Sequence, residues 1–369
     1  MSTIRSTGIA IPPYTYDQKT SRLHVERWLG DRAHHFRRVL DAFESGLVET
    51  RSSVLPIEEI FLPRTFREKN DLYAKGALEL GERAVRACLD RAGLEPGDID
   101  YFITSSCTGF MIPGVDALLA HRMRMKPSLG RLPISQHGCA GGAVALRQAH
   151  EHLAAHPGHR VLVLAVEIPT VTLQLDDLSP ENLISTSLFG DGAAAAVLTS
   201  GGRGGEPAIV ATESCMFPES EDLMGWELRD SGLKILLSKR VPSEIKAHAP
   251  GAIIGFLARQ GVGIEEIGHY LLHPGGRKII DGFEASFSLT RNELGSTRSV
   301  LRKHGNLSSA TVLFVLDEHL RAGHGKRGDL GLLVAFGPGF GCESLLLHWG
   351  PRAARRERPA TEAPVEAAL

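Results

Sequence analysis

The stretch SQHGCAGGA, residues 135–143, is the main evidence for the fold. Part of it is repeated later in the chain. A short apolar run, 132–134, precedes it, and residues 143–153 place apolar and polar side chains at helical spacing. The pattern predicts a strand, a glycine-flanked turn and a helix. Such a turn places the Cys139 sulfur at the positive end of the helix, which favours a thiolate. Cys139 is therefore a candidate nucleophile, although close packing in a core also explains a small buried cysteine.

An internal repeat predicts the architecture. The tripeptides His-Gly-Cys at 137–139 and His-Gly-Asn at 304–306 are 167 positions apart, and so are the Glu-His-Leu tripeptides at 151–153 and 318–320. Both copies stand in the same expected order of helix, strand, turn, helix and strand, which indicates a duplicated α/β unit. If the two units face each other, the turns that carry the cysteine and the asparagine meet in one central site.

The chain is expected to divide at its glycine-rich segment, 201–207. Residues 1–200 then form an N-terminal half that carries the cysteine, and residues 201–350 form a C-terminal half that carries the histidine and asparagine described below. Residues 351–369 are rich in Ala, Pro, Arg and Glu and have no apolar period, so we expect a disordered tail there.

Composition excludes several classes of protein. The 369 residues include 41 basic and 43 acidic side chains, so no overall field attracts the chain to nucleic acid or to an anionic membrane. No apolar run is long enough to span a membrane, and residues 1–14 show no targeting pattern, so we expect no membrane insertion and a cytoplasmic protein. The five cysteines are scattered and never form a CxxC pair, which argues against disulfides and zinc.

His273 adds a proton carrier to the candidate site. It follows the apolar residues 270–272 and precedes Pro-Gly-Gly, and a histidine there can exchange a proton near neutral pH. Cys139, His273 and Asn306 have the chain order of papain-like cysteine proteases, and the 134-residue interval from cysteine to histidine also fits. That interpretation is rejected because the local Cys-Gly-Ser/Ala-Cys-Trp/Tyr motif is missing and because such proteases lack a duplicated α/β architecture.

Five motifs give the sequence a specific resemblance to type III polyketide synthases, the chalcone synthase-like enzymes of the thiolase superfamily. The motifs are GCAGG at 138–142, FGDGAA at 189–194, HPGG at 273–276, GNLSS at 305–309 and FGPG at 336–339. The resemblance extends from about Thr7 to Trp349. It implies a homodimer and an α/β, thiolase-like, five-layered αβαβα fold from two duplicated halves. It also implies that Cys139, His273 and Asn306 match the family's catalytic triad.

The resemblance implies a decarboxylative condensation. Cys139 takes an acyl starter from an acyl-CoA, and His273 stabilises its thiolate. Malonyl-CoA loses carbon dioxide, and His273 and the Asn306 amide bind the oxygen of the resulting enolate. The enolate attacks the acyl-cysteine, and the product cyclises after repeated extension. Acyl-CoA and malonyl-CoA are the expected partners, and the reaction requires neither a metal nor a redox cofactor.

Further residues follow from the same resemblance. The expected cavity residues are Phe189, Ile235, Thr172, Cys107, Glu167, Ser308, Gly337, Pro338 and Gly339. The expected contacts to the CoA phosphates are Arg37, Arg38 and Lys278, although a solvated helix face explains Arg37 and Arg38 as well. The glycines at 337–341 do not indicate a dinucleotide site, because the third glycine is misplaced and no strand–turn–helix unit with a distal acid follows.

Ring closure is expected to give a pyrone. Plant members use a hydroxyl, a carboxylate and a serine for an aldol closure, and the matching positions here are Cys107, Glu167 and Ser308. A thiol at 107 is a weaker donor than a hydroxyl, so activation of water for the aldol route is disfavoured.

The starter is expected to be a medium- or long-chain fatty acyl-CoA, giving an alkylpyrone or alkylresorcinol. In plant relatives two phenylalanines restrict access to the cavity. The first is retained here as Phe189, and Ile235 occupies the position of the second. The missing ring leaves apolar volume, where each buried methylene contributes about 0.8 kcal/mol. Residues 173–188 also resemble bacterial alkylpyrone and alkylresorcinol synthases. Bulky Trp226 favours the alternative, a malonyl-primed synthase of the tetrahydroxynaphthalene-forming type.

Two more interpretations stay open. Initiating β-ketoacyl-carrier-protein synthases share the fold and the triad, but AFGPG at 335–339 favours the polyketide branch. A non-catalytic thiolase-fold binding protein is disfavoured, because a protein that only binds has no need of all three triad residues.

Overall fold

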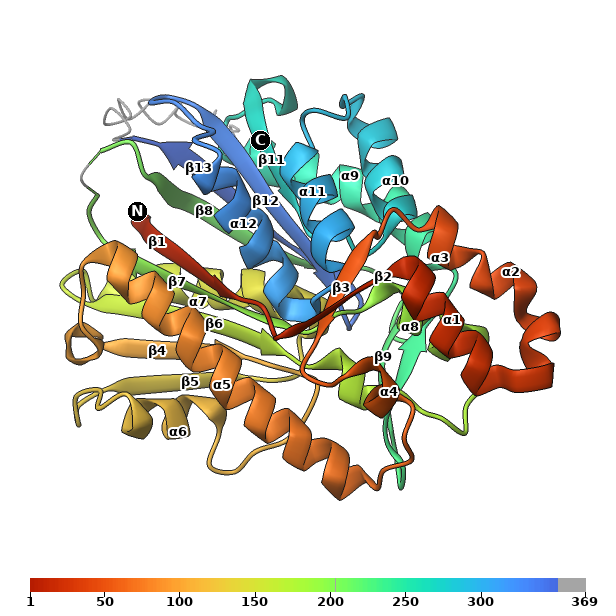
Figure 1. The fold of residues 1–369 in the computed structure, drawn as a ribbon. Coiled ribbons are helices and arrows are strands. Elements are labelled where there is room, and N and C mark those ends of the chain that lie inside the picture. Colours follow the sequence, from red (N-terminus) through yellow and green to blue (C-terminus); the bar gives the residue numbers. More distant parts are fainter. Residues whose placement is uncertain (203, 351–369) are drawn as a thin grey trace, which may run out of the picture.

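The computed structural model describes residues 1–202 and 204–350, in which nine strands form one sheet (Figure 1). From one edge to the other the strands are β11 (Ile267–Leu272), β12 (Leu330–Gly337), β13 (Gly341–Trp349), β8 (Pro207–Met216), β1 (Ser2–Ala10), β7 (Gly192–Thr199), β6 (Arg160–Glu167), β4 (Tyr101–Ser105) and β5 (Gly130–Ile134). Strands β1 and β8 pair only through Ser2 with Ile209 and Thr3 with Ala208. The sheet therefore has two halves that are joined at a short junction.

Helices cover both faces of both halves. They are α5 (Phe66–Ala92), α6 (Val115–Arg122), α7 (Gly141–Ala155), α9 (Val241–Arg259), α10 (Arg277–Phe287), α11 (Gly295–His304) and α12 (Thr311–Arg321). Val163 of β6 and Leu333 of β12 pack in one cluster with α7 and α12, whereas their neighbours Leu162 and Leu332 face α5 and α9, respectively. Because side chains alternate along a strand, α7 and α12 lie between the two half-sheets. The order of layers is αβαβα, and the predicted thiolase-like fold is confirmed.

Local signals explain the long helix α5. Thr65 caps its first turn and forms a capping box with Glu68, and Gly93 ends it in the left-handed conformation with φ 68°. Gly8 of β1 lies directly against this helix, since a Cβ there would come within 2.4 Å of the Cys88 backbone nitrogen. The absence of a side chain at this position lets helix and strand approach closely.

The two halves repeat each other, but with a small change of register. The short helix η3 (Gly138–Ala140) leads into α7, and η6 (Ser308–Ala310) leads into α12. The first residues of these two turns, Gly138 and Ser308, are 170 positions apart. The repeated tripeptides in the sequence are only 167 positions apart. Ser309 therefore takes the place of Cys139 in the second copy, and Asn306 lies just before the turn.

A set of smaller segments covers one end of the sheet, and we call it the cap (Figure 1). It comprises β2 (Tyr14–Asp17), α1 (Gln18–Leu29), η1 (Gly30–Phe36), α2 (Arg37–Leu40), α3 (Ala42–Ser45), β3 (Thr50–Ser53), α4 (Ile57–Ile60), α8 (Pro180–Leu188) and the hairpin of β9 (Met224–Arg229) and β10 (Gly232–Leu237). Its own small core includes Val25, Phe43 and Leu183.

The remaining elements are the short helices η2 (Pro96–Asp98), η4 (Pro169–Thr172) and η5 (Ile264–Glu266). In the described part of the chain, no helix combines the length and apolar character needed to span a bilayer. The expected tail, 351–369, lies outside the described residues.

Candidate active site

A large cavity lies between the cap and the ends of the strands. Its empty space is about 1370 Å³ when the open mouth is included. Its wall brings together residues far apart in the sequence, from Tyr16 in β2 to Pro338 after β12. The N-terminal segment before α5 is thus part of the cavity wall.

The three candidate catalytic residues meet in this cavity. Cys139 lies in η3, His273 follows β11, and Asn306 precedes η6, and all three line the wall. They are almost completely enclosed, with 6% of Cys139 and 2% each of His273 and Asn306 exposed. The prediction that the turns at Cys139 and Asn306 meet is confirmed.

Backbone contacts and hydrogen bonds fix the orientation of Asn306. Its N–H donates to the Leu188 carbonyl over 2.8 Å, which holds Asn306 beside Phe189. Its Oδ1 accepts from the backbone N–H of Ser308 over 2.8 Å, and Nδ2 donates to the Gly275 carbonyl over 3.3 Å. The amide oxygen is therefore held by Ser308, and the amide nitrogen is the donor that remains for a substrate.

Glycine is required where the two loops cross beside Asn306. A Cβ on Gly190 would lie 2.7 Å from the His304 carbonyl, and one on Gly305 would lie 2.5 Å from the Leu188 carbonyl. Gly305 also has a φ of 71°, which side chains other than glycine rarely adopt. These two glycines let the FGDG and GNLSS motifs pack backbone against backbone.

Burial sets the protonation of Cys139 and His273. Burial raises the pKa of the Cys139 thiol to about 11, although hydrogen bonds from Ser308 and Asn306 act to lower it. Burial also lowers the pKa of His273 to about 3. Neither group is thus readily charged on its own. A thiolate and an imidazolium formed together, by transfer of one proton from a thiol to a ring, would carry no net charge, and burial penalises such a pair less than a lone ion.

A hydroxyl links the two cysteines of the site. The Cys139 thiol donates to Ser308 Oγ over 3.7 Å, and Cys107 Sγ lies 3.4 Å from the same oxygen. Buried Glu167 accepts from the backbone N–H of Cys107 over 3.1 Å. The three residues expected to control ring closure are therefore brought together around Cys139.

Glu167 was also expected among the cavity residues, but it is fully buried and does not line the cavity. Burial raises its pKa, and this effect opposes hydrogen bonds from Ser309, Cys107 and Thr108. The Thr108 hydroxyl donates to the carboxylate over 2.8 Å. Thr108 and Ser309 were not predicted from the sequence, although both stand next to residues that were.

The other expected cavity residues divide into two groups. Phe189, Thr172, Ile235 and Pro338 line the cavity. Gly337 and Gly339, which were also expected in the wall, do not line the cavity. A Cβ on Gly337 would lie 2.5 Å from the His137 carbonyl, so this glycine packs against the turn of the nucleophile.

The expected CoA contacts lie outside the cavity. Arg37 and Arg38 are exposed on α2, and Lys278 is exposed on α10. The Arg277 guanidinium donates to the Ser45 carbonyl of α3 over 3.2 Å, which holds α10 against the cap. Arg37 and Arg38 therefore lie in the cap, and Lys278 lies on the helix that contacts the cap.

Arg51 is a cavity residue that sequence analysis missed. It lies on β3, its guanidinium donates to the Phe189 carbonyl over 3.1 Å, and its buried Nε has no hydrogen-bond partner among the described residues. Burial lowers its pKa to about 10, and Asp191 acts in the opposite direction. A lone arginine in a short strand carries no local signal of such a position. Among the described residues, no group of three or more His, Cys, Asp or Glu could hold a metal ion.

Comparisons with known proteins agree with this geometry. Residues 58–202 match the N-terminal domain family of chalcone and stilbene synthases, and residues 208–350 match the C-terminal domain family. A 1,3,6,8-tetrahydroxynaphthalene synthase of Streptomyces peucetius subsp. caesius is 36% identical over 94% of this chain and 93% of that protein. A phloroglucinol synthase of Pseudomonas fluorescens is 32% identical over 95% of this chain and 99% of that protein.

A solved structure shows the same fold throughout. The crystal structure of 1,3,6,8-tetrahydroxynaphthalene synthase from Streptomyces coelicolor A3(2), a bacterial type III polyketide synthase, matches with a TM-score of 0.90 and 30% identity. The match covers 95% of this chain and 100% of that one. These likenesses extend across both halves of the chain. The chain therefore belongs to the chalcone and stilbene synthase family and is a type III polyketide synthase.

Proposed function

We propose that this synthase loads an acyl-CoA starter on Cys139 and extends it with malonyl-CoA. The observation that carries this proposal is the meeting of Cys139, His273 and the oriented Asn306 amide in one enclosed cavity. The sulfur attacks the thioester carbonyl, and the departing CoA sulfur takes the proton held by His273. No carrier protein takes part in this step.

Extension uses the same three residues. Loss of carbon dioxide from malonyl-CoA leaves an electron pair on the thioester, and the enolate oxygen accepts hydrogen bonds from Asn306 Nδ2 and His273. The enolate carbon then attacks the acyl group on Cys139, the carbon–sulfur bond breaks, and the lengthened chain remains on CoA. Repetition of this cycle gives the chain that closes into a ring.

Replacement of His273 by glutamine tests how the nucleophile is activated. We expect slower alkylation of Cys139 by iodoacetamide at neutral pH, because the thiolate then lacks its positive partner. The apparent pKa of the reaction should therefore rise relative to that of the wild type. An alkylation profile identical to that of the wild type would show that His273 does not form the ion pair. Replacement of exposed His121 by glutamine is the matched control.

The starter that we propose is a medium- or long-chain fatty acyl-CoA. The cavity wall next to Ile235 is apolar and includes Leu237, Val241, Ile245 and Ile279. Because burial of alkyl chains is favourable in proportion to their area, this wall suits an aliphatic starter. The contacts of Cys107 with Ser308 support closure to an alkylpyrone, since the thiol is a weak donor.

A specific observation favours a second candidate, a synthase primed by malonyl-CoA itself. Trp226 lines the cavity and reduces its width, and two of the relatives described above are tetrahydroxynaphthalene synthases. Incubation with malonyl-CoA alone and with acyl-CoAs of increasing length, followed by mass determination of the products, separates the two candidates. Products that contain the alkyl chain support the first, and an aromatic product from malonyl-CoA alone supports the second.

Replacement of Ile235 by phenylalanine should shorten the longest acyl-CoA accepted. The ring fills volume that distal methylenes would occupy, each of which contributes about 0.8 kcal/mol when buried. Leu236→Phe is the control, because Leu236 lies on the exposed face of the same strand. Decarboxylation of malonyl-CoA should stay unchanged in both variants. A chain-length preference unaffected by Ile235→Phe would place the alkyl chain elsewhere.

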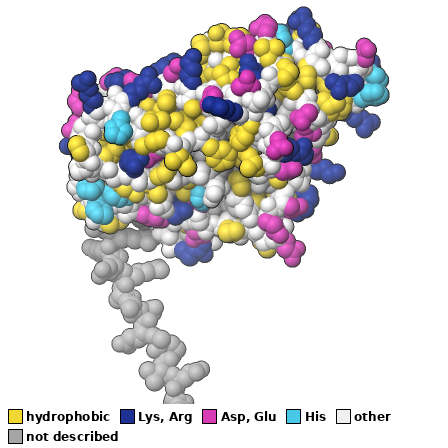
Figure 2. All heavy atoms as spheres, turned by 90° about the horizontal axis from the view of Figure 1, so that it is seen from below, with side chains coloured by type: hydrophobic (Ala, Val, Ile, Leu, Met, Phe, Trp, Pro, Cys, Tyr) yellow, Lys and Arg dark blue, Asp and Glu magenta, His cyan; other side chains and the backbone are white. Residues whose placement is uncertain are grey.

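We also propose a homodimer. Phe110 and Ile112 are large apolar side chains that are exposed on the loop between Cys107 and α6. Figure 2 shows hydrophobic side chains gathered over much of the face of the molecule seen from below. Exposed apolar patches of this kind are typical of protein interfaces. Sedimentation equilibrium measures the mass of the assembly, and a monomer at micromolar concentration would contradict this proposal.

A further inference from the structure

The β9–β10 hairpin forms a wall of the cavity although it is not part of the large sheet. Its two strands pair only with each other. Trp226 and Ile235 face each other directly across the strands, and both line the cavity. A two-stranded hairpin is marginally stable by itself. Contacts with other segments must therefore hold these two side chains in place.

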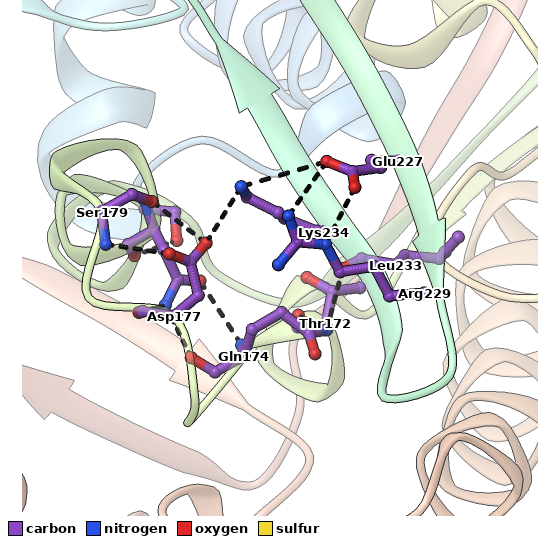
Figure 3. A network of polar contacts seen from close by, with 10 residues as sticks. Thr172, Gln174, Asp177, Ser179, Glu227, Arg229, Leu233 and Lys234 are labelled. Atoms are coloured by element: carbon purple, nitrogen blue, oxygen red, sulfur yellow. Dashed lines mark hydrogen bonds and ion pairs between the residues drawn. The ribbon is translucent and has the colours of Figure 1, made fainter.

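One anchor is Gln174, which is completely buried between η4 and α8. Its Nε2 donates to the Leu233 carbonyl of β10 over 3.0 Å and to the Thr172 carbonyl over 2.8 Å (Figure 3). Asn182 holds the Gln174 backbone, since Asn182 Nδ2 donates to the Gln174 carbonyl over 2.7 Å. The amide thus joins the hairpin to the segment that carries Thr172, another residue of the cavity wall.

The second anchor is Lys69 in the first turn of α5. Its ammonium donates to the Ser231 carbonyl over 2.9 Å, to the Leu173 carbonyl over 3.0 Å and to Gln174 Oε1 over 3.4 Å. Ser231 lies in the turn between the two strands of the hairpin. Three acceptors use all the donors of an ammonium group. Lys69 therefore connects the tip of the hairpin, Gln174 and the helix.

A partly buried ion pair adds to this arrangement. Figure 3 shows the Lys234 side chain directed toward both Asp177 and Glu227. The distances are 3.6 Å to Asp177, in the segment before α8, and 3.9 Å to Glu227, in the neighbouring strand. The Lys234 and Asp177 side chains are only 18% and 11% exposed, so their pair supplements the two anchors, whereas the contact with the more exposed Glu227 contributes little by itself. The buried contacts of Gln174 and Lys69 are the stronger connection, because unpaired buried carbonyls are costly.

We propose that Gln174 and Lys69 are positioning residues that fix the hairpin and thereby set the acyl chain lengths that the cavity accepts. The inference rests on the proposed function. Within the described residues, neither one lines the cavity, so both act through Trp226 and Ile235. Both bind backbone carbonyls of the hairpin, so they fix its position independently of its side chains. Loss of either anchor lets the wall move outward and weakens discrimination against long starters.

The test compares Gln174→Leu and Lys69→Met with Arg229→Gln. Leucine and methionine keep approximate size but remove the donors. Arg229 donates to Glu227 of its own strand and serves as the matched control. Hydrogen exchange of the amides of residues 224–237 should become about tenfold faster in both anchor variants, as expected for loss of a hydrogen bond to a buried or charged group. The control should exchange like the wild type.

Specificity supplies the second measurement. The ratio of kcat/KM for dodecanoyl-CoA to that for hexanoyl-CoA should rise about fivefold or more in both anchor variants, if one lost hydrogen bond loosens the wall. Malonyl-CoA decarboxylation should stay within about twofold, because the triad is untouched. Arg229→Gln should change neither quantity.

Two results would overturn the inference. Unchanged hydrogen exchange in both variants would show that the hairpin does not depend on these anchors. Faster exchange with an unchanged ratio would show that the position of the hairpin does not set chain length. Failure of the wild type to use any acyl-CoA would instead overturn the proposed function, and exchange would still report the anchoring separately. If Gln174→Leu fails to fold, Lys69→Met still tests the inference. Lys69 is only partly buried, so its replacement disturbs folding less.

Discussion

Replacement of Cys139 by alanine should abolish polyketide formation and leave the fold intact. Without the sulfur, no acyl-enzyme can form, so each later step lacks its electrophile. Alanine is smaller than cysteine and suits the turn, where Gly138 and Gly141 already bring the backbone close to Pro338 and Ser105. The measurements are product formation from an acyl-CoA and malonyl-CoA, and the melting temperature of the variant.

Two features make this experiment specific. Cys215 lies outside the cavity and is partly exposed, so Cys215→Ala is the matched control and should keep full activity. Labelled acyl group should remain on the wild type and on Cys215→Ala after denaturation, but not on Cys139→Ala. Stable labelling of Cys139→Ala would refute the assignment of the nucleophile.

Replacement of Asn306 should separate loading from extension. Asn306→Ala removes a donor aimed at the enolate oxygen, and loss of one such donor lowers the rate by about 100- to 1,000-fold. Loading of starter on Cys139 should fall much less, because the attack on the thioester does not pass through this enolate. Decarboxylation of malonyl-CoA and burst labelling by an acyl-CoA measure the two steps.

A second variant separates catalysis from folding. Asn306→Ala also deprives the buried Ser308 N–H of its acceptor, which costs about 1–3 kcal/mol of stability. Asn306→Asp keeps that acceptor but has no amide donor, so it should be equally poor at decarboxylation, and its melting temperature reports the effect on folding separately. Equal losses of loading and decarboxylation in both variants would contradict this division of roles.

The fold could be predicted from the sequence because its two halves share local signals. Glycine-flanked turns at Cys139 and before Asn306, each followed by an apolar helix, indicated duplication, and the structure brings both turns to one cavity. The five layers themselves came from the resemblance to a known family. The three-residue shift between η3 and η6 could not be predicted from the sequence, because the repeated tripeptides suggested a repeat without gaps.

The cavity wall was harder to predict than the triad. Arg51 carries no motif, and its position depends on how β3 packs against Phe189, which is far away in the sequence. The same holds for the link from Gln174 to the hairpin. Gly337, at the end of β12, packs against the turn of the nucleophile, a contact between distant segments that its own motif does not reveal.

The central claim is that Cys139 takes an acyl group directly from CoA and passes it to malonyl-CoA. The most direct measurement is the intact mass of the protein after incubation with an acyl-CoA, followed by peptide mapping and a chase with malonyl-CoA. Our account predicts an added mass equal to the acyl group, located on the peptide that contains Cys139, which disappears during the chase as a product containing the acyl group forms. An acyl group on another residue, or one on Cys139 that persists through the chase, would contradict it.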